Sequence, residues 1–152
     1  MKQATLWIIL QDDKILLCMK KRWFWAGFWN GPGGKIEAWE TEKQAMIREM
    51  QEETTLEAKE NNLEKVWVLH FYFDQDSTWN LDAHVFKILA FEGVPTETEE
   101  MKPEWFEILK IPYDQMWEDD KIWFPRMLSG EKIEYDFYFW NDGKIRDYKV
   151  IQ

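Results

Sequence analysis

Residues 33–56 read GGKIEAWETEKQAMIREMQEETTL, and they form the most informative stretch of the sequence. Thr41 and Gln44 form a T-x-x-Q capping box, a pattern that predicts the start of a helix. Good helix formers follow, without Gly or Pro, up to about Thr54. The sequence therefore predicts one helix from this capping box to about Thr54.

The predicted helix carries three glutamates on one stripe, Glu49, Glu52 and Glu53, because they are related by steps of three and four residues. Met46 and Met50 lie on the neighbouring stripe, which can pack on a core. Stacked like charges cost an isolated helix a few tenths of a kcal/mol, roughly, per pair. A hard divalent cation with oxygen ligands would offset that repulsion, and Mg²⁺ is the usual one beside phosphates. A solvated acidic face is the plainer alternative, and three glutamates alone would favour it.

The residues around these glutamates favour a metal site over a solvated acidic face. The stretch resembles the signature of the Nudix hydrolases, G-x5-E-x7-R-E-U-x-E-E-x-G-U with U apolar, and the following residues fill their slots: Gly34, Glu40, Arg48, Glu49, Met50, Glu52, Glu53 and Leu56. One slot departs, because Thr55 stands where the family has its late Gly. That Gly ends the helix in a left-handed turn, where Thr is unfavourable, so we expect a remodelled helix end.

Composition narrows the class of protein. The chain has 152 residues, of which 45% are hydrophobic, so we expect one globular domain over residues 1–152. Aromatic residues make up 17% with 11 Trp, and we expect some of them to line a pocket for a flat ligand. The net charge of −10 disfavours polymeric nucleic acid and anionic membranes as partners. A small anionic substrate remains possible if metal ions and local Lys or Arg residues neutralise it.

The cysteine content and the absence of a signal-peptide pattern bear on the cellular compartment. The single Cys18 can form no internal disulfide, which suits a reducing environment, and no signal-peptide pattern or membrane-spanning run is present in the sequence. We expect a cytoplasmic monomer, with other reducing compartments such as the nucleus or mitochondrion still open. Cys18 itself lies in an apolar run and is expected to be a packing residue.

Strand patterns surround the predicted helix. The apolar runs 5–10 and 15–19 predict a first hairpin, and further strands are expected at 65–73, 81–91, 104–109, 133–140 and 145–150. A second helix is expected from Asp119 or Asp120 to about Leu128, shortened or kinked at Pro125. His70 and His84 fall within strands, where a structural role is the plainer interpretation. Strands on both sides of a helix indicate a mixed α/β sandwich (α/β/α), which is also the fold that the Nudix resemblance implies.

The resemblance also implies roles at a metal site. Glu49, Glu52 and Glu53 would be the ligands, joined by a carbonyl of Gly33 or Gly34, with Mg²⁺ as the ion and Mn²⁺ as another possibility. Arg48 would hold the Glu52 carboxylate, and Glu40 would be a structural acid. Glu100 aligns with a further metal-ligand or base position, although Glu97 and Glu99 are chemically equivalent. Glu53 and Glu100 are both candidates for the general base, unless the metal itself activates the water, and the sequence does not choose.

Similarity beyond the helix points to one branch of the family. The segments 16–35, 82–86, 100–112 and 116–125 resemble the animal hydrolases of oxidised purine nucleoside triphosphates. That likeness implies purine recognition by Asn30, Trp117, Asp119 and Asp120. Further pocket candidates by the same likeness are Phe24, Phe71, Phe73, Trp123, Thr5, Lys20 and Leu81.

Physical chemistry makes these roles reasonable. An indole stacks on a purine, and an Asn offers both a donor and an acceptor. Two adjacent acids in a buried site should differ in protonation, so together they present a donor and an acceptor. A charged pair capping the second helix is the plainer alternative for Asp119 and Asp120. Pro32 and Glu118 stand where the most similar relatives carry other residues, so the pocket near the base is expected to differ in shape.

The resemblance implies a Mg²⁺-dependent hydrolase that cuts nucleoside triphosphates between the α- and β-phosphates. The expected substrates are 8-oxo-dGTP and 2-hydroxy-dATP, with O6-methyl-dGTP as a further possibility. An RNA 5′ end or a dinucleotide polyphosphate is the alternative substrate class. A binding module that has lost turnover is the non-enzyme alternative.

Overall fold

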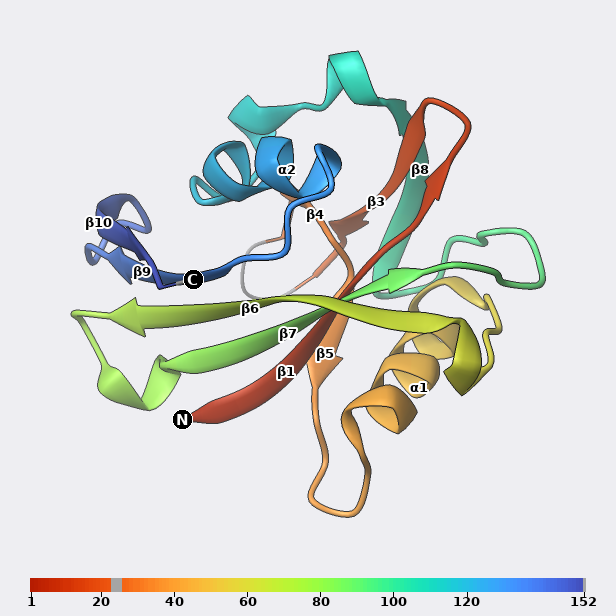
Figure 1. The fold of residues 1–152 in the computed structure, drawn as a ribbon, viewed down its shortest axis with the longest axis horizontal. Coiled ribbons are helices and arrows are strands. Elements are labelled where there is room, and N and C mark those ends of the chain that lie inside the picture. Colours follow the sequence, from red (N-terminus) through yellow and green to blue (C-terminus); the bar gives the residue numbers. More distant parts are fainter. Residues whose placement is uncertain (23–25, 152) are drawn as a thin grey trace.

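The computed structural model describes residues 1–22 and 26–151, and within them ten strands form two sheets (Figure 1). In the six-stranded sheet the order is β10 (Ile145–Val150), β9 (Glu134–Phe139), β6 (Leu63–Phe73), β7 (Leu81–Ile88), β1 (Lys2–Ile8) and β5 (Gly33–Lys35). The second sheet contains β2 (Leu10–Gln11), β3 (Lys14–Lys20), β4 (Trp29–Asn30) and, paired with β3, β8 (Met101–Glu107). The helices are α1 (Glu42–Thr54) and α2 (Asp120–Leu128), with 3₁₀ turns at Glu60–Asn62, Ser77–Trp79, Ile108–Lys110 and Tyr113–Gln115.

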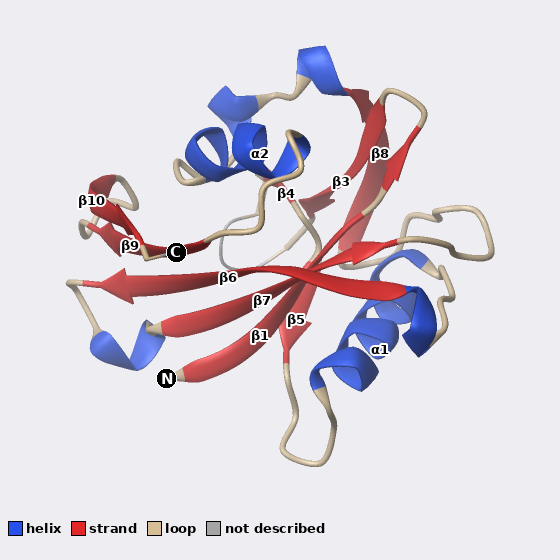
Figure 2. Ribbon diagram, viewed as in Figure 1, coloured by secondary structure: helices blue, strands red, loops and turns tan. Residues whose placement is uncertain are grey.

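Two helices lie on opposite sides of the six-stranded sheet (Figure 2). Helix α1 contacts β1, β5 and β8. Helix α2 packs on β6, where the rings of Trp123 and Trp67 lie 5.8 Å apart. This arrangement confirms the predicted α/β class with mixed sheets between helices.

Each helix covers its own hydrophobic cluster. Under α1, the side chains of Met46 and Met50 are fully buried together with Trp7 and Phe86. Under α2, Trp123 joins Trp67, Leu69 and Phe137. A fully buried large apolar side chain contributes about 1.5–3 kcal/mol to folding, so these two clusters hold α1 and α2 at fixed positions on the sheet.

The capping box of α1 forms as predicted. The Thr41 hydroxyl accepts from the Gln44 N–H at 3.1 Å, and the Gln44 side-chain oxygen accepts from the Thr41 N–H at 2.9 Å. The expectation of a remodelled helix end is wrong. Thr55 adopts the left-handed conformation itself, at φ 64°, and its N–H donates to the Gln51 carbonyl at 3.0 Å.

The first hairpin is smaller than predicted. Only β2 and β3 pair as a hairpin, through Leu10 and Ile15, whereas β1 pairs in parallel with β7 and antiparallel with β5. The single residue Ile9 separates β1 from β2, so the chain crosses from one sheet to the other within a continuous apolar run. Apolar content alone could not reveal that crossing, because Ile8 and Ile9 are both buried and the apolar run shows no break where the sheets change.

Several strand boundaries also differ from the prediction, whereas α2 ends at Leu128 as predicted. Strand β8 begins at Met101, three residues before the predicted strand at 104–109, because it pairs along β3 from Lys20 back to Lys14. Strand β7 ends at Ile88, three residues before the predicted end. Helix α2 reaches Leu128 with Pro125 inside it, so the proline does not shorten the helix. The carbonyl that Pro125 leaves without its helical donor belongs to the exposed Lys121, where water can solvate it.

Candidate functional site

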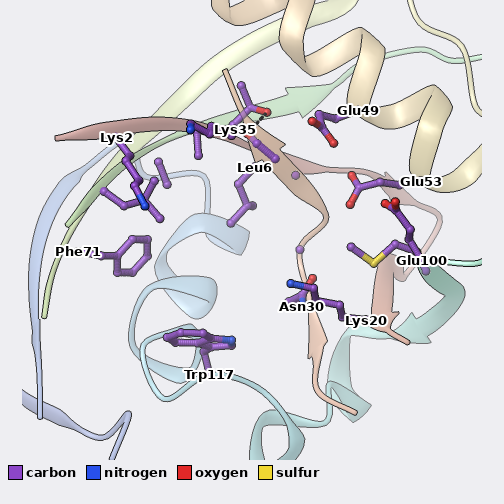
Figure 3. Close-up of a pocket in the computed structure, with 18 of the residues that line it drawn as sticks. Lys2, Leu6, Lys20, Asn30, Lys35, Glu49, Glu53, Phe71, Glu100 and Trp117 are labelled. Carbon is purple, nitrogen blue, oxygen red and sulfur yellow. Dashed lines mark hydrogen bonds between the residues drawn. The ribbon is translucent and has the colours of Figure 1, made fainter. Parts of the chain in front are cut away.

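A cavity of about 510 Å³ opens beside β1, β5 and α1. Its two ends differ in chemistry (Figure 3). Glu49, Glu53 and Glu100 line one end, and Phe71 and Trp117 line the other. Three of the predicted acidic residues and two of the predicted aromatic residues therefore meet in one cavity, whereas Glu52 does not line it.

The carboxylates of α1 differ in exposure. The side chain of Glu53 is buried, that of Glu49 is 14% exposed and that of Glu52 is 56% exposed. Burial raises the pKa of Glu49 above its ordinary value, although Arg48 opposes the shift. Burial and then the charge of Glu49 raise the pKa of Glu53 well above its ordinary value. Trp7 opposes this second shift through its indole N–H, although its geometry falls short of a hydrogen bond.

Arg48 ties the acidic side chains to the backbone. Its guanidinium donates to Glu40 at 3.0 Å, Glu49 at 2.8 Å, Glu52 at 3.4 Å and the Lys35 carbonyl at 3.1 Å. The hydrogen bond from Arg48 is the main reason that the pKa of Glu40 is lowered. Glu40 also accepts from the Glu37 N–H at 2.9 Å, which closes the loop before α1. These contacts agree with a holding role for Arg48 and a structural role for Glu40.

Two glycines allow the backbone to pass close to the site. A Cβ on Gly34 would lie 2.2 Å from the carboxyl carbon of Glu49. A Cβ on Gly33 would lie 1.9 Å from the Thr5 carbonyl oxygen, so a side chain there would separate β5 from β1. Thr5 is buried, and its hydroxyl donates to the Gly34 carbonyl at 3.3 Å.

The donor types at this end suit a divalent cation. Carboxylates and a backbone carbonyl are the oxygen ligands that Mg²⁺ prefers. Glu53 Oε1 is buried without a hydrogen-bond partner among the described residues, which is costly unless another group binds it. Within the described part of the chain, no three acidic or histidine side chains yet converge on one point, and Glu52 is held towards Arg48. Metal ligation by all three glutamates therefore stays a prediction.

Among the three acids before β8, only one lines the cavity. Glu100 does so, while Glu97 forms an ion pair with Lys21 and the Glu99 side chain is 89% exposed. Arg22 approaches Glu100 at 3.6 Å and lines the same cavity. The geometry favours Glu100 among these three as the acid that faces a substrate.

A smaller cavity of about 160 Å³ adjoins the aromatic end. Asp119, Asp120 and Phe73 line it, and six residues line both cavities: Leu6, Asn30, Gly31, Phe71, Leu81 and Trp117. Burial raises the pKa of Asp119 to about 6 and that of Asp120 well above its ordinary value, where the charge of Asp119 adds to the effect. The carboxyl pair therefore has the raised pKa values that a pair sharing one proton needs.

Most of the predicted pocket residues gather at these two cavities. Lys20 and Thr5 line the larger one. Trp123 lines neither and is fully buried behind the carboxyl pair, where its indole N–H donates to Asp119 at 3.0 Å. Phe24 lies outside the described residues.

Some lining residues were not predicted, among them Leu6, Gly31, Lys2, Lys35 and Met101. Lys2 and Leu6 lie four residues apart on one face of β1, together with Ala4. Side chains alternate between the two faces of a strand, so a predicted strand that began at residue 2 would place Lys2, Ala4 and Leu6 on one face. Lys35 carries no such pattern, because its position follows from β5 pairing with β1.

The other reactive groups have structural surroundings. Both ring nitrogens of His70 contact carboxylates, those of Asp82 and Glu134, and His84 contacts Gln3 at 2.7 Å. Burial raises the pKa of the Cys18 thiol far above its ordinary value, so it stays protonated in the core. These observations favour the structural interpretation of all three residues. Among the described residues, no helix is long and apolar enough to cross a membrane.

Comparisons with known proteins identify the family. Residues 1–127 match the model of the NUDIX domain. The oxidized purine nucleoside triphosphate hydrolase of Danio rerio is 42% identical over 98% of this chain and 94% of its own length, and that of Mus musculus is 40% identical over 96% and 92%. A crystal structure of the MutT protein from Bacillus halodurans superposes with a TM-score of 0.86 at 28% identity, covering 99% of this chain and 98% of that one. The chain therefore belongs to the Nudix hydrolase family.

Proposed function

We propose that this chain is a Mg²⁺-dependent pyrophosphohydrolase of oxidised purine nucleoside triphosphates such as 8-oxo-dGTP and 2-hydroxy-dATP. Water would attack a phosphorus atom next to the oxygen that bridges the α- and β-phosphates, and the bond between that phosphorus and the bridging oxygen would break, which releases a nucleoside monophosphate and pyrophosphate. The 42% and 40% identical relatives named for this substrate class support the proposal.

One structural observation carries the proposal. The cavity with the carboxylates and the smaller aromatic cavity share lining residues. A purine triphosphate requires both kinds of surroundings, one for its phosphates and one for its base. The polyphosphate would lie towards Glu49, Glu53 and Glu100, with Lys20 and Arg22 supplying positive charge on the same cavity wall. The purine would lie towards Trp117, with the two aspartates beyond it.

The residues at the acidic end would position and balance charge. Glu49, Glu52 and Glu53, with a carbonyl of Gly33 or Gly34, would hold a divalent cation. Such an ion, when bound, would neutralise the charge that develops on the phosphate oxygens and activate the attacking water. Arg48 would keep Glu49 and Glu52 in place, as its contacts with both carboxylates suggest. Glu53 and Glu100 remain the two candidates for accepting the proton of the water.

The residues at the aromatic end would read the base. Trp117 would stack on the purine, and Asn30 would offer a donor and an acceptor to its edge. Asp119 and Asp120 with one shared proton would offer a donor and an acceptor side by side. Such a pair can meet the altered edge of either oxidised guanine or oxidised adenine, because the proton can reside on either carboxyl.

The test is a panel of initial rates at saturating Mg²⁺. The substrates are 8-oxo-dGTP, 2-hydroxy-dATP, O6-methyl-dGTP, dGTP, dATP, a dinucleotide polyphosphate and a short 5′-triphosphorylated RNA. We expect an oxidised purine triphosphate to exceed the unmodified ones by well over tenfold in kcat/KM, which is above about 1.4 kcal/mol. Faster hydrolysis of the dinucleotide polyphosphate or the RNA would support a hydrolase but overturn the assignment of oxidised purine triphosphates as substrates. The absence of turnover on all seven substrates would favour a binding module.

Two variants separate the ends of the site. Glu53→Gln should remove most turnover while nucleotide binding persists, and Glu60→Gln, on the exposed 3₁₀ turn after α1, is its matched control. Trp117→Ala should lower the preference for the oxidised base, and Trp39→Ala, whose side chain is 80% exposed, is the control for losing an indole. Full activity in the first variant would overturn the metal-site assignment, and unchanged base preference in the second would overturn the stacking role.

A further inference from the structure

The segment that leads into α2 carries three acids in a row, and each side chain has different surroundings. The Asp120 N–H donates to the Trp117 carbonyl at 3.1 Å, so residues 117–120 form a tight turn. Asp119 is directed to the Trp123 indole, and neither aspartate caps the helix through its side chain. Glu118 leaves this turn in another direction and accepts a hydrogen bond from the backbone N–H of Ile145 at 3.0 Å.

Ile145 begins β10 at an irregular point of the β9–β10 hairpin. It is in register with Phe139, and the register shifts before Asp147. Its N–H is satisfied by the Glu118 carboxylate, which is 27 residues away in sequence. A carboxylate that accepts from a backbone N–H makes a charge-assisted hydrogen bond, stronger than a neutral one.

The neighbouring aromatic residue reaches the same place in the hairpin. The Trp117 ring meets the Phe139 ring edge-on, with the centroids 5.7 Å apart. Adjacent residues of the turn, Trp117 and Glu118, therefore contact the paired residues Phe139 and Ile145. Two contacts at one point restrict rotation of the segment, whereas the aromatic contact alone would let it pivot.

The charge of Glu118 is also placed to act on its neighbour. Burial is the main cause of the raised pKa of Asp119, and Glu118 adds to it while Trp123 opposes it. Tyr113 is the other titratable group facing the pair, and its own pKa is raised by burial and by Asp120. Glu118 lines a surface hollow of about 240 Å³ together with the charged residues Asp114, Lys121, Asp142 and Lys144.

We infer that Glu118 is a positioning residue for base recognition, which fastens the Trp117–Asp120 turn to the first backbone N–H of β10. This inference rests on the proposed function, because it deepens the role given there to Trp117, Asp119 and Asp120.

Three variants of the full chain test the inference with 8-oxo-dGTP as the probe. Glu118→Ala removes both the hydrogen bond and the charge, and we expect KM to rise about fivefold to tenfold with kcat within about twofold. Glu118→Gln keeps an acceptor oxygen, so KM should return to within about twofold of the parent. Asp114→Ala is the matched control, because Asp114 is an exposed acid on the rim of the same hollow.

The dependence of kcat/KM on pH separates the effect of the Glu118 charge from the effect of its hydrogen bond to Ile145. Both Glu118 variants remove a negative charge next to Asp119, so the acid limb of kcat/KM should move to lower pH in both, although only the alanine variant raises KM. A merely structural residue would not move that limb in a variant with normal KM. An unchanged KM in Glu118→Ala, an equal rise in Asp114→Ala, or a glutamine variant as impaired as the alanine variant would overturn the inference.

Amide hydrogen exchange at Ile145 gives a readout that needs no substrate. Loss of its acceptor should speed exchange in Glu118→Ala at least tenfold, and much less in Glu118→Gln. If the parent enzyme shows no preference for oxidised purines, the proposed function fails whatever the exchange rate. If that preference holds while exchange at Ile145 is unchanged in Glu118→Ala, only the role of Glu118 fails.

Discussion

Thr55 sits in a backbone conformation that disfavours it. Its φ of 64° is left-handed, a region that costs a residue with a Cβ about 1–2 kcal/mol, and the family places a glycine there. The strain does not move the helix end, because the Thr55 N–H still bonds to Gln51 and the next residue, Leu56, is fully buried in the cluster under α1. Thr55, two residues after Glu53, therefore lowers the stability of the protein without moving the end of the helix.

Replacing Thr55 by Gly should stabilise the protein. The exposed side chain has few contacts to lose, and the relief of strain exceeds the greater flexibility of glycine in the unfolded chain, for a net gain of about 0.5–1 kcal/mol. Urea unfolding at constant slope m measures it. Thr55→Ala is the control, since alanine keeps a Cβ and should gain less than half as much. An equal gain in both variants would show that the benefit comes from losing the threonine side chain.

At the scale of elements, α1 could be predicted because its signals are local. The capping box, the glutamate stripe and the buried Met46 face all lie within one segment, so no distant contact can reassign them. Strand β5 could not be predicted as a strand, because three residues beginning with two glycines become a strand only through pairing with β1. The same holds for the site. Glu53 is predicted by the motif and Glu100 by the resemblance outside it, whereas Lys2 and Lys35 enter the cavity through sheet register.

Histidine 70 joins three strands of the six-stranded sheet on the face away from Trp67. It lies on β6 and contacts Asp82 of β7 through one ring nitrogen and Glu134 of β9 through the other, at 2.5 and 2.6 Å. Burial would lower the pKa of His70, but the hydrogen bonds to these two carboxylates outweigh it and raise the pKa above 6.5. Asp136 of β9, His84 of β7 and Tyr72 of β6 are further titratable groups on this face. The imidazolium therefore stabilises the folded state.

The pH dependence of stability follows from that sign. A raised folded pKa means that the contribution is complete below about pH 6.5 and is lost as pH rises through the folded value. The contribution is lost because the neutral imidazole can no longer donate from both ring nitrogens to Asp82 and Glu134. Urea unfolding at about pH 6 and pH 9 should show this decline in the parent and a flatter profile in His70→Gln. His84→Gln is the control, because burial lowers the pKa of His84 and its contribution has the opposite sign. A parent-like decline in His70→Gln would contradict the assignment.

At the scale of the whole molecule, charge is distributed unevenly. The net charge is −10, yet Lys2, Lys20, Arg22 and Lys35 all line the main cavity. A mononucleotide places its whole polyphosphate within reach of these cations. A longer RNA would place its additional phosphates outside the cavity, near a surface of the same sign. The molecule should therefore discriminate against polymers by long-range repulsion as well as by pocket shape.

The discrimination against polymers can be tested by varying the ionic strength, because repulsion predicts the direction in which the relative kcat/KM changes. Salt screens repulsion between exposed charges, with a screening length of about 30 Å at 0.01 M and about 8 Å at 0.15 M. For a 5′-triphosphorylated RNA of about ten nucleotides, kcat/KM relative to the matching nucleoside triphosphate should therefore rise with salt across that range, at fixed saturating free Mg²⁺. Proteins that bind nucleic acid through basic surfaces show the reverse, because salt weakens their phosphate contacts. A relative kcat/KM for RNA that falls as salt rises would mean that a basic path outside the cavity guides the polymer, and it would favour an RNA end over a free nucleotide as the substrate.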